Sequence, residues 1–194
     1  KAIVNVDEIE KSELLSKVIV GNKNSTVATV IEKLGNSDWV NIGIKYVHID
    51  GDKGVCPFCQ QETITQNFLE EINAYFDESY NQEKTQIEQM ISRYDTEIKK
   101  VTNFLNTIKE DISLEKKKTE LENLSTMLIS ISEQNLNVLR DKLKTPSIQV
   151  SLQPISEIIA SINNTIEYAN KEIALYNQKI ANIKGAKKTI RDRF

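Results

Sequence analysis

The feature that most constrains the fold is a row of apolar residues recurring at alternating steps of four and three near the C-terminus. A repeat of 3.5 residues places one apolar seam along a helix, and a seam of this kind is stable only when another helix covers it. Pro154 suits the first position of such a helix. The pattern predicts a packed helix over about residues 154–185. The seam consists of Ile155, Ile159, Ile162, Ile166, Ala169, Ile173, Tyr176, Ile180 and Ile183.

Two further seams precede it. Ile64, Phe68, Ile72 and Phe76 recur every fourth residue and lead into Ile87, Ile91, Tyr94, Ile98, Val101, Leu105, Ile108 and Ile112; then come Leu121, Leu124, Leu128, Ile131 and Val138. Asp111 or Ser113 can cap a new helix, and Thr145-Pro146 ends the last seam. A helix unbroken at 112 would leave much of its seam uncovered, so a break is expected there. The prediction is helices at about 64–112, 114–144 and 154–185.

These patterns predict a mainly α fold, either a long antiparallel helical hairpin or a three-helix coiled-coil bundle, because short connectors favour antiparallel neighbours. Both Tyr94 and Tyr176 occupy seam positions and are expected in the core. Gly185 is expected to end the last helix. The domain prediction is a subdomain at 1–62, the helices at 63–185, and a basic tail at 186–194 leading to a missing remainder.

Residues 1–62 predict a small α/β subdomain built from short elements. A short helix is expected within 13–20, and Ser25 and Gly35 are expected to cap a helix over 26–34. Another turn of helix carries Trp39, interpreted as a packing anchor, and closes at Gly43. Residues 44–49 look extended, and Asp50-Gly51 is a tight-turn pair that leads towards the only two cysteines.

Net charge is −3 and the pI is about 5.4, which excludes an overall basic field for nucleic acid or an anionic membrane. A local basic cluster remains at Lys187, Lys188, Arg191 and Arg193. No apolar run approaches the ~20 residues of a membrane span. We therefore expect a soluble, cytoplasmic piece of a longer protein, without a membrane partner. Cysteines three residues apart fit metal or redox chemistry in a reducing compartment better than a disulfide framework.

The stretch Cys56-Pro57-Phe58-Cys59 is the one chemically distinctive motif. Two thiolates at this spacing can hold one metal ion, whereas structural zinc takes four ligands, so the motif is half a site. The other half would come from a second protomer, from sequence outside this chain, or in part from His48, the only histidine. A metal-free knuckle is the alternative, and no βαβ pattern supports a thioredoxin-like role.

The sequence contains no phosphate-binding loop, nucleophile elbow or HExxH motif. Because the chain has a single histidine, the sequence does not favour a catalytic Ser/His/Asp triad. No catalytic residue and no cofactor-binding residue is therefore predicted in this chain, and Cys56 and Cys59 are the predicted metal ligands.

The run from Ser37 to Gly43 (SDWVNIG), followed by CPFCQQ and a coiled coil, resembles the ATPases related to the anticodon nucleases PrrC and RloC, an SMC/ABC-like AAA group. The resemblance implies that the chain is a coiled-coil insert between the two halves of a nucleotide-binding domain, with ATP bound only in the missing parts of the parent protein. It implies partners in those parts or in a second copy, and a role in phage defence.

The motif is also similar to the zinc hook of double-strand-break repair ATPases, in which two protomers each give two cysteines to one zinc. Here, however, no long helix precedes Cys56, so the knuckle is expected at the base or side of the coil. The sequence thus favours an interaction module that transmits a signal between ATPase heads. Two alternatives stay open: a nucleic-acid-binding module that uses the basic tail or the knuckle, and a purely structural helical bundle.

Overall fold

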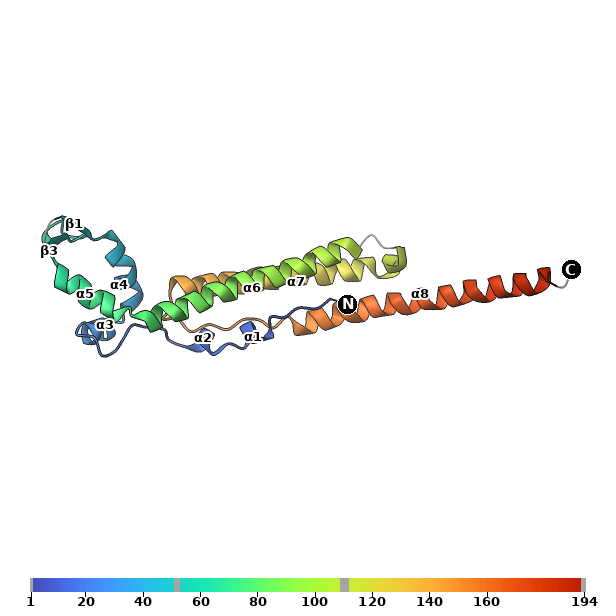
Figure 1. The fold of residues 1–194 in the computed structure, drawn as a ribbon, viewed down its shortest axis with the longest axis horizontal. Helices are drawn as coiled ribbons and strands as arrows, with labels where there is room; N and C mark the ends of the chain where they lie inside the picture. Colours follow the sequence, from blue (N-terminus) through green and yellow to red (C-terminus); the bar gives the residue numbers. More distant parts are fainter. Residues whose placement is uncertain (1, 51–52, 109–111, 193–194) are drawn as a thin grey trace. The chain divides into compact units, whose positions relative to one another are not determined.

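The computed structural model describes residues 2–50, 53–108 and 112–192. The chain is 72% helical with one small antiparallel sheet, which confirms the mainly α prediction. In chain order the elements are α1 (Asp7–Glu10), α2 (Glu13–Ser16), α3 (Ala28–Leu34), α4 (Ser37–Gly43), the 3-10 turn η1 (Ile44–Tyr46), β1 (His48–Asp50), β2 (Lys53–Val55), β3 (Glu62–Thr65), α5 (Gln66–Tyr75), α6 (Glu78–Ile108), the 3-10 helix η2 (Ile112–Lys117), α7 (Lys118–Lys144) and α8 (Ser156–Arg191) (Figure 1).

The chain packs into two compact units, each discontinuous in sequence. The first unit comprises residues 1–7, 94–135 and 153–194, and the second comprises 8–93 and 136–152. Helices α6 and α7 contribute residues to both units. The domain ranges 1–62, 63–185 and 186–194 stay a prediction.

The first unit is built on the predicted seams. Tyr94, Val101 and Leu105 of α6 are buried, as are Leu121 and Leu128 of α7 and Ile155 and Ile162 at the start of α8. A polar residue joins these elements. The buried Asn135 side chain donates to the Tyr94 hydroxyl at 2.8 Å and to the Gln153 carbonyl at 2.8 Å, and its oxygen accepts from the Gln153 N–H. Because every polar atom of this amide is paired, it fixes the register of α7 without an unsatisfied buried group.

The covered part of α8 ends near Glu172. Ala169 is 3% exposed, whereas Tyr176 is 65% and Ile183 56% exposed, so the prediction of a core Tyr176 is wrong. At this point η2 contacts α8 through a 3.5 Å ion pair from Lys116 to Glu172 and through the Lys117 ammonium, which lies over the Tyr168 ring. Periodicity predicts where a stripe lies on a helix, but it does not say how far the covering elements extend.

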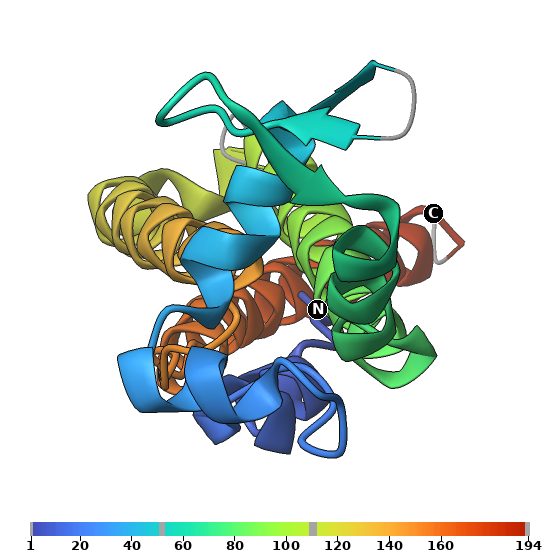
Figure 2. The ribbon, with the colours of Figure 1, turned by 90° about the vertical axis from the view of Figure 1, so that its left-hand side faces the viewer.

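The second unit has a core of large side chains from short elements and the start of α6: Ile19, Ala28, Ile31, Ile72, Tyr75, Phe76, Tyr80 and Ile87. Gly21 lies directly against Tyr75, since a Cβ there would meet the ring at 2.4 Å. The sheet has the order β1-β2-β3, and Figure 2 shows it beside α4 and α5. This unit carries the cysteine turn.

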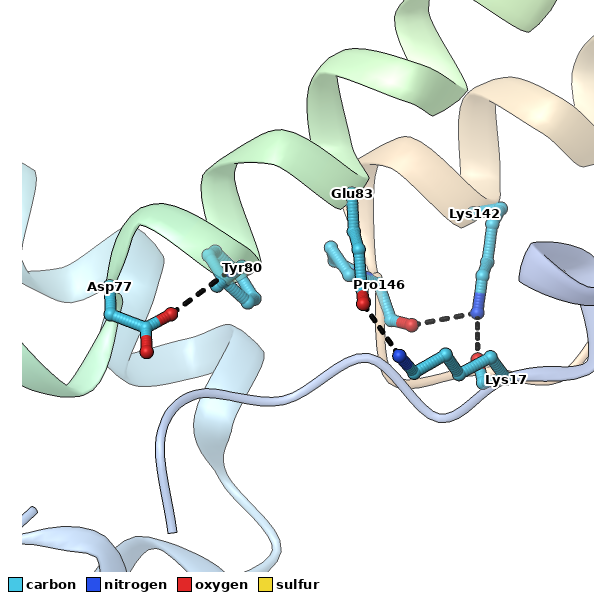
Figure 3. Close-up of polar contacts among 6 residues, drawn as sticks. All are labelled: Lys17, Asp77, Tyr80, Glu83, Lys142 and Pro146. Atoms are coloured by element: carbon cyan, nitrogen blue, oxygen red, sulfur yellow. Dashed lines mark hydrogen bonds and ion pairs between the residues drawn. The ribbon is translucent and has the colours of Figure 1, made fainter. Parts of the chain in front are cut away.

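A buried lysine holds two crossing segments of this unit together. The Ile19 N–H donates to the Pro146 carbonyl, and the Val150 N–H donates to the Leu15 carbonyl. Between these segments the Lys142 ammonium, fully buried, donates to the carbonyls of Lys17 and Pro146 (Figure 3) and also to the carbonyl of Ile148. Three carbonyl acceptors satisfy the three ammonium donors, which is what permits the charge to be buried.

Several predicted boundaries are corrected. The range 64–112 was predicted as one helix, but its first two residues belong to β3, and the rest forms two helices, α5 and α6, separated at Phe76 and Asp77. The Asp77 carboxylate accepts the Tyr80 N–H and so caps α6 (Figure 3). The break predicted near 112 is present: α6 ends at Ile108 and η2 begins at Ile112, with residues 109–111 outside the described range. Gly185 does not end α8, which continues to Arg191.

The N-terminal elements differ in detail. The C-cap at Gly35 is confirmed by its left-handed φ of 59°, but α3 begins at Ala28 and the Ser25 side chain does not cap it. The helix expected within 13–20 is one turn, α2. Residues 44–46 form a 3-10 turn instead of extended chain, so only β1 is a strand here. In the predicted Asp50-Gly51 turn, Asp50 is the last residue of β1, and Gly51 lies outside the described residues.

Candidate metal-binding turn and apolar groove

The cysteine turn lies between β2 and β3 and is closed by backbone hydrogen bonds. The Gln60 N–H donates to the Cys56 carbonyl at 2.9 Å, and the Cys56 N–H donates to the Gln61 carbonyl at 2.9 Å. Gln60 takes a left-handed conformation with φ of 57°, and its side chain donates to the Pro57 carbonyl. A non-glycine residue in this region is uncommon, so the surrounding bonds hold the turn in one shape.

The Cys56 thiol has a perturbed pKa in this turn. The backbone N–H groups of Cys59 and Phe58 lower the pKa of Cys56 below its ordinary value, because they stabilise the thiolate. Both cysteines are free thiols; Cys59 is exposed and Cys56 is partly exposed. Two thiols on one preformed turn, with N–H groups directed at one sulfur, have the donor chemistry that zinc requires from half of a tetrahedral site. The residues therefore fit a zinc ion.

The structure does not bring a third ligand to the pair. Among the residues it describes, no three His, Cys, Asp or Glu side chains gather where they could share a metal ion. His48 pairs with Val55 across β1 and β2. Successive side chains of a strand point to opposite faces, so His48 shares a face with Val55 and not with the next residue, Cys56. The alternative in which His48 completes the site is therefore not supported by the described structure.

An apolar groove of about 440 Å³ adjoins the turn. Cys56, Pro57 and Phe58 line one side, and most of the other lining residues belong to α3, α4 and α5, among them Val30, Val40 and Phe68. Trp39 stacks on Phe58 with ring centroids 5.1 Å apart and an interplanar angle of 22°. Both rings stay open to solvent, Trp39 being 54% and Phe58 68% exposed. Exposed aromatic rings around an apolar hollow are typical of binding surfaces.

Sequence reasoning found the cysteines but not the groove. The sequence predicts Trp39 as a packing anchor, and it does pack, but on Phe58, which is also exposed. Sheet strands β2 and β3 were also not predicted, although they position the turn. Gly54 of β2 allows the Val47 and Ile64 side chains to pack against the strand. A Cβ at this position would lie 2.8 Å from Val47 and 3.3 Å from Ile64.

The predicted basic cluster lies on α8 in the other unit. Lys187, Lys188 and Arg191 belong to this helix, whereas Arg193 is outside the described residues. No helix in the described part of the chain is long and apolar enough to cross a membrane.

Comparison with known families gives one match. A family model described as an AAA domain matches residues 2–194. The chain belongs to the AAA domain family. Searches of curated proteins and of solved structures return no match. Because the family model covers nearly the whole chain, both the cysteine turn and the long helices lie within the matched region.

Proposed function

We propose that this AAA-family chain is a non-catalytic interaction module of a larger P-loop ATPase, of the SMC-like kind related to the anticodon nucleases PrrC and RloC. In this proposal Cys56 and Cys59 supply two thiolates to a structural zinc, and a second copy supplies the other two. The apolar seams at 87–112 and 155–183 supply rigidity, and the helices that carry them transmit a signal between ATPase heads. The family match supports the ATPase context.

The observation that carries the proposal is the preformed turn beside the apolar groove. The left-handed Gln60 and the backbone N–H groups that lower the Cys56 pKa are features that suit a thiolate ligand. Zinc bound by one pair of thiolates requires two more ligands, and the exposed Trp39 and Phe58 offer apolar surface that such a partner would cover. The shared zinc and the apolar contacts would then both stabilise the same interface.

ATP has no binding loop in this sequence, so the proposal assigns nucleotide binding to other parts of the parent protein. The module would respond to that nucleotide through its helices. A role in anticodon-nuclease regulation or phage defence belongs to the same proposal and rests on the resemblance of the SDWVNIG and CPFCQQ segments.

Metal analysis combined with light scattering tests the proposal. Purified under reducing conditions with added zinc, the chain is expected to carry one zinc per two chains and to run as a dimer. The Cys56→Ser/Cys59→Ser variant is expected to lose both, while His48→Ala retains both. Cobalt substitution reports directly on thiolate ligation through the sulfur-to-metal absorption band. A metal-free chain that associates identically to the double cysteine variant would refute the zinc role and favour a purely structural bundle.

A further inference from the structure

The C-terminal half of α8 presents an apolar stripe that is partly exposed in the described part of the chain. The stripe consists of Ile173, Tyr176, Ile180 and Ile183, continuing at steps of three and four from the buried Ile162, Ile166 and Ala169. The spacing of the apolar residues stays the same beyond Ala169, the last buried residue of the helix. Side chains that are buried inside the unit up to Ala169 are thus followed, on the same face of the same helix, by the half-buried Ile173 and Ile180 and the exposed Tyr176 and Ile183.

The stripe has the shape of a coiled-coil seam. With Ile173 and Ile180 at a positions, Tyr176 and Ile183 fall at d, and β-branched residues at a are typical of paired helices. The face is narrow, since Asn177, Gln178 and Lys179 follow Tyr176 directly. A helix that lies on a membrane needs a broad apolar face instead. A narrow seam that extends an existing one calls for a single further helix.

Charge identifies the chemistry of that helix. Residues 173–191 contain Lys179, Lys184, Lys187, Lys188 and Arg191 and no aspartate or glutamate. Lys179 and Lys184 occupy the g and e positions that flank the seam, where charge sets the choice of partner. None of the five cations has an ion pair within the described residues.

We propose that the stripe at 173–183 of α8 docks an acidic amphipathic helix, with aliphatic residues in its seam and glutamates beside it. A second copy of the stripe does not meet this requirement, because two copies would bring together only cations. Nucleic acid would use the lysines but would leave the aliphatic seam in water. An acidic helix satisfies both features at once, and neither the cysteine turn nor its zinc is involved.

Fluorescence anisotropy with synthetic helices tests this proposal. The probe is a labelled three-heptad peptide with Ile at a, Leu at d and Glu at e and g; the control peptide has the same seam with Lys at e and g. The full chain is expected to bind the Glu peptide and not the Lys peptide, with affinity falling as salt rises. Tyr176→Ser/Ile180→Ser and, separately, Lys179→Glu/Lys184→Glu are each expected to weaken binding at least tenfold.

Leu175→Ser is the matched control variant, because Leu175 is 54% exposed on the same helix but lies off the stripe, and it is expected to bind as the unchanged chain does. Circular dichroism verifies that every variant keeps its helix content. Equal binding of both peptides, or binding insensitive to the stripe variants, would overturn the proposal. So would stripe-dependent binding of a single-stranded oligonucleotide or anionic vesicles with no peptide binding, or stripe-dependent dimers in sedimentation.

Discussion

At the scale of single residues, Lys142 shows how a buried charge can hold backbone segments together. Its ammonium meets three carbonyls and no carboxylate, so replacement removes three charge-assisted hydrogen bonds and leaves carbonyls without that donor. Lys142→Met is expected to lower the free energy of unfolding by about 2 kcal/mol. Lys144→Met, two residues on and exposed, is the control and should change little. Urea unfolding followed by circular dichroism measures the stability of both variants. If Lys142→Met is as stable as the unchanged chain, the three hydrogen bonds of Lys142 contribute nothing to stability.

The same residue predicts a pH dependence. Burial lowers the pKa of Lys142, although the negative charges of Asp38 and Glu83 act to raise it. A lysine with a lowered folded pKa binds its proton more weakly in the folded chain than in the unfolded chain. Its contribution to stability therefore increases as pH rises from the folded pKa towards the ordinary lysine value of about 10.4. The stability difference between the unchanged chain and Lys142→Met should widen between neutral and alkaline pH; a constant difference would contradict this.

Cys56 offers a second test at this scale. Because the N–H groups of Cys59 and Phe58 lower the pKa of Cys56, its thiolate forms at lower pH than in the unfolded chain. In the Cys59→Ser variant, which keeps the backbone donors, the midpoint of iodoacetamide reactivity against pH is expected to lie below that of the same variant in urea. Coincident midpoints would mean that the turn does not direct its N–H groups at the sulfur.

At the scale of elements, two glycines make opposite predictions. A methyl group at Gly21 would lie 2.4 Å from the Tyr75 ring and 2.5 Å from the Tyr75 carbonyl, whereas one at Gly185 meets nothing within 4 Å. Gly21→Ala is expected to destabilise the chain by about 1–3 kcal/mol through overpacking. Gly185→Ala should instead increase helicity, since alanine is favoured over glycine by about 1 kcal/mol in a helix interior. Thermal melts and helix content by circular dichroism distinguish the two; destabilisation by both would contradict the packing at Gly21.

The elements also show how far sequence reasoning reaches. Long seams were predictable because burial repeats with the helix period, as at Ile87, Tyr94 and Leu105. Short elements were not, since their formation depends on contacts that are remote in sequence. The Thr65 hydroxyl accepts the Phe68 N–H at the start of α5, but the residues before it form β3 only because β2 lies beside them. For the site, the sequence indicates the thiols, while the groove arises from three separate helices and the turn.

At the scale of the whole molecule, exposure along α8 separates residues that hold the fold from residues available to partners. Burial on this helix ends at Ala169, with Ile162 fully buried and Ile183 56% exposed. The described structure thus predicts that folding depends on the first four turns of α8 and not on the last four. A helix segment that buries nothing adds little to stability, because most helix stability in proteins comes from packing.

Truncation measures this division directly. A chain that ends at Ile180 keeps two turns beyond Glu172 to absorb fraying, and its free energy of unfolding is expected to match that of the full chain within about 0.5 kcal/mol. Ile162→Ala, which opens a cavity in the covered part of the same helix, is expected to cost about 3 kcal/mol. Urea unfolding of the three proteins under identical conditions gives the comparison. A large loss on truncation would mean that residues 181–194 are packed against the rest of the chain in solution, and the stripe would then not be free to receive an acidic helix.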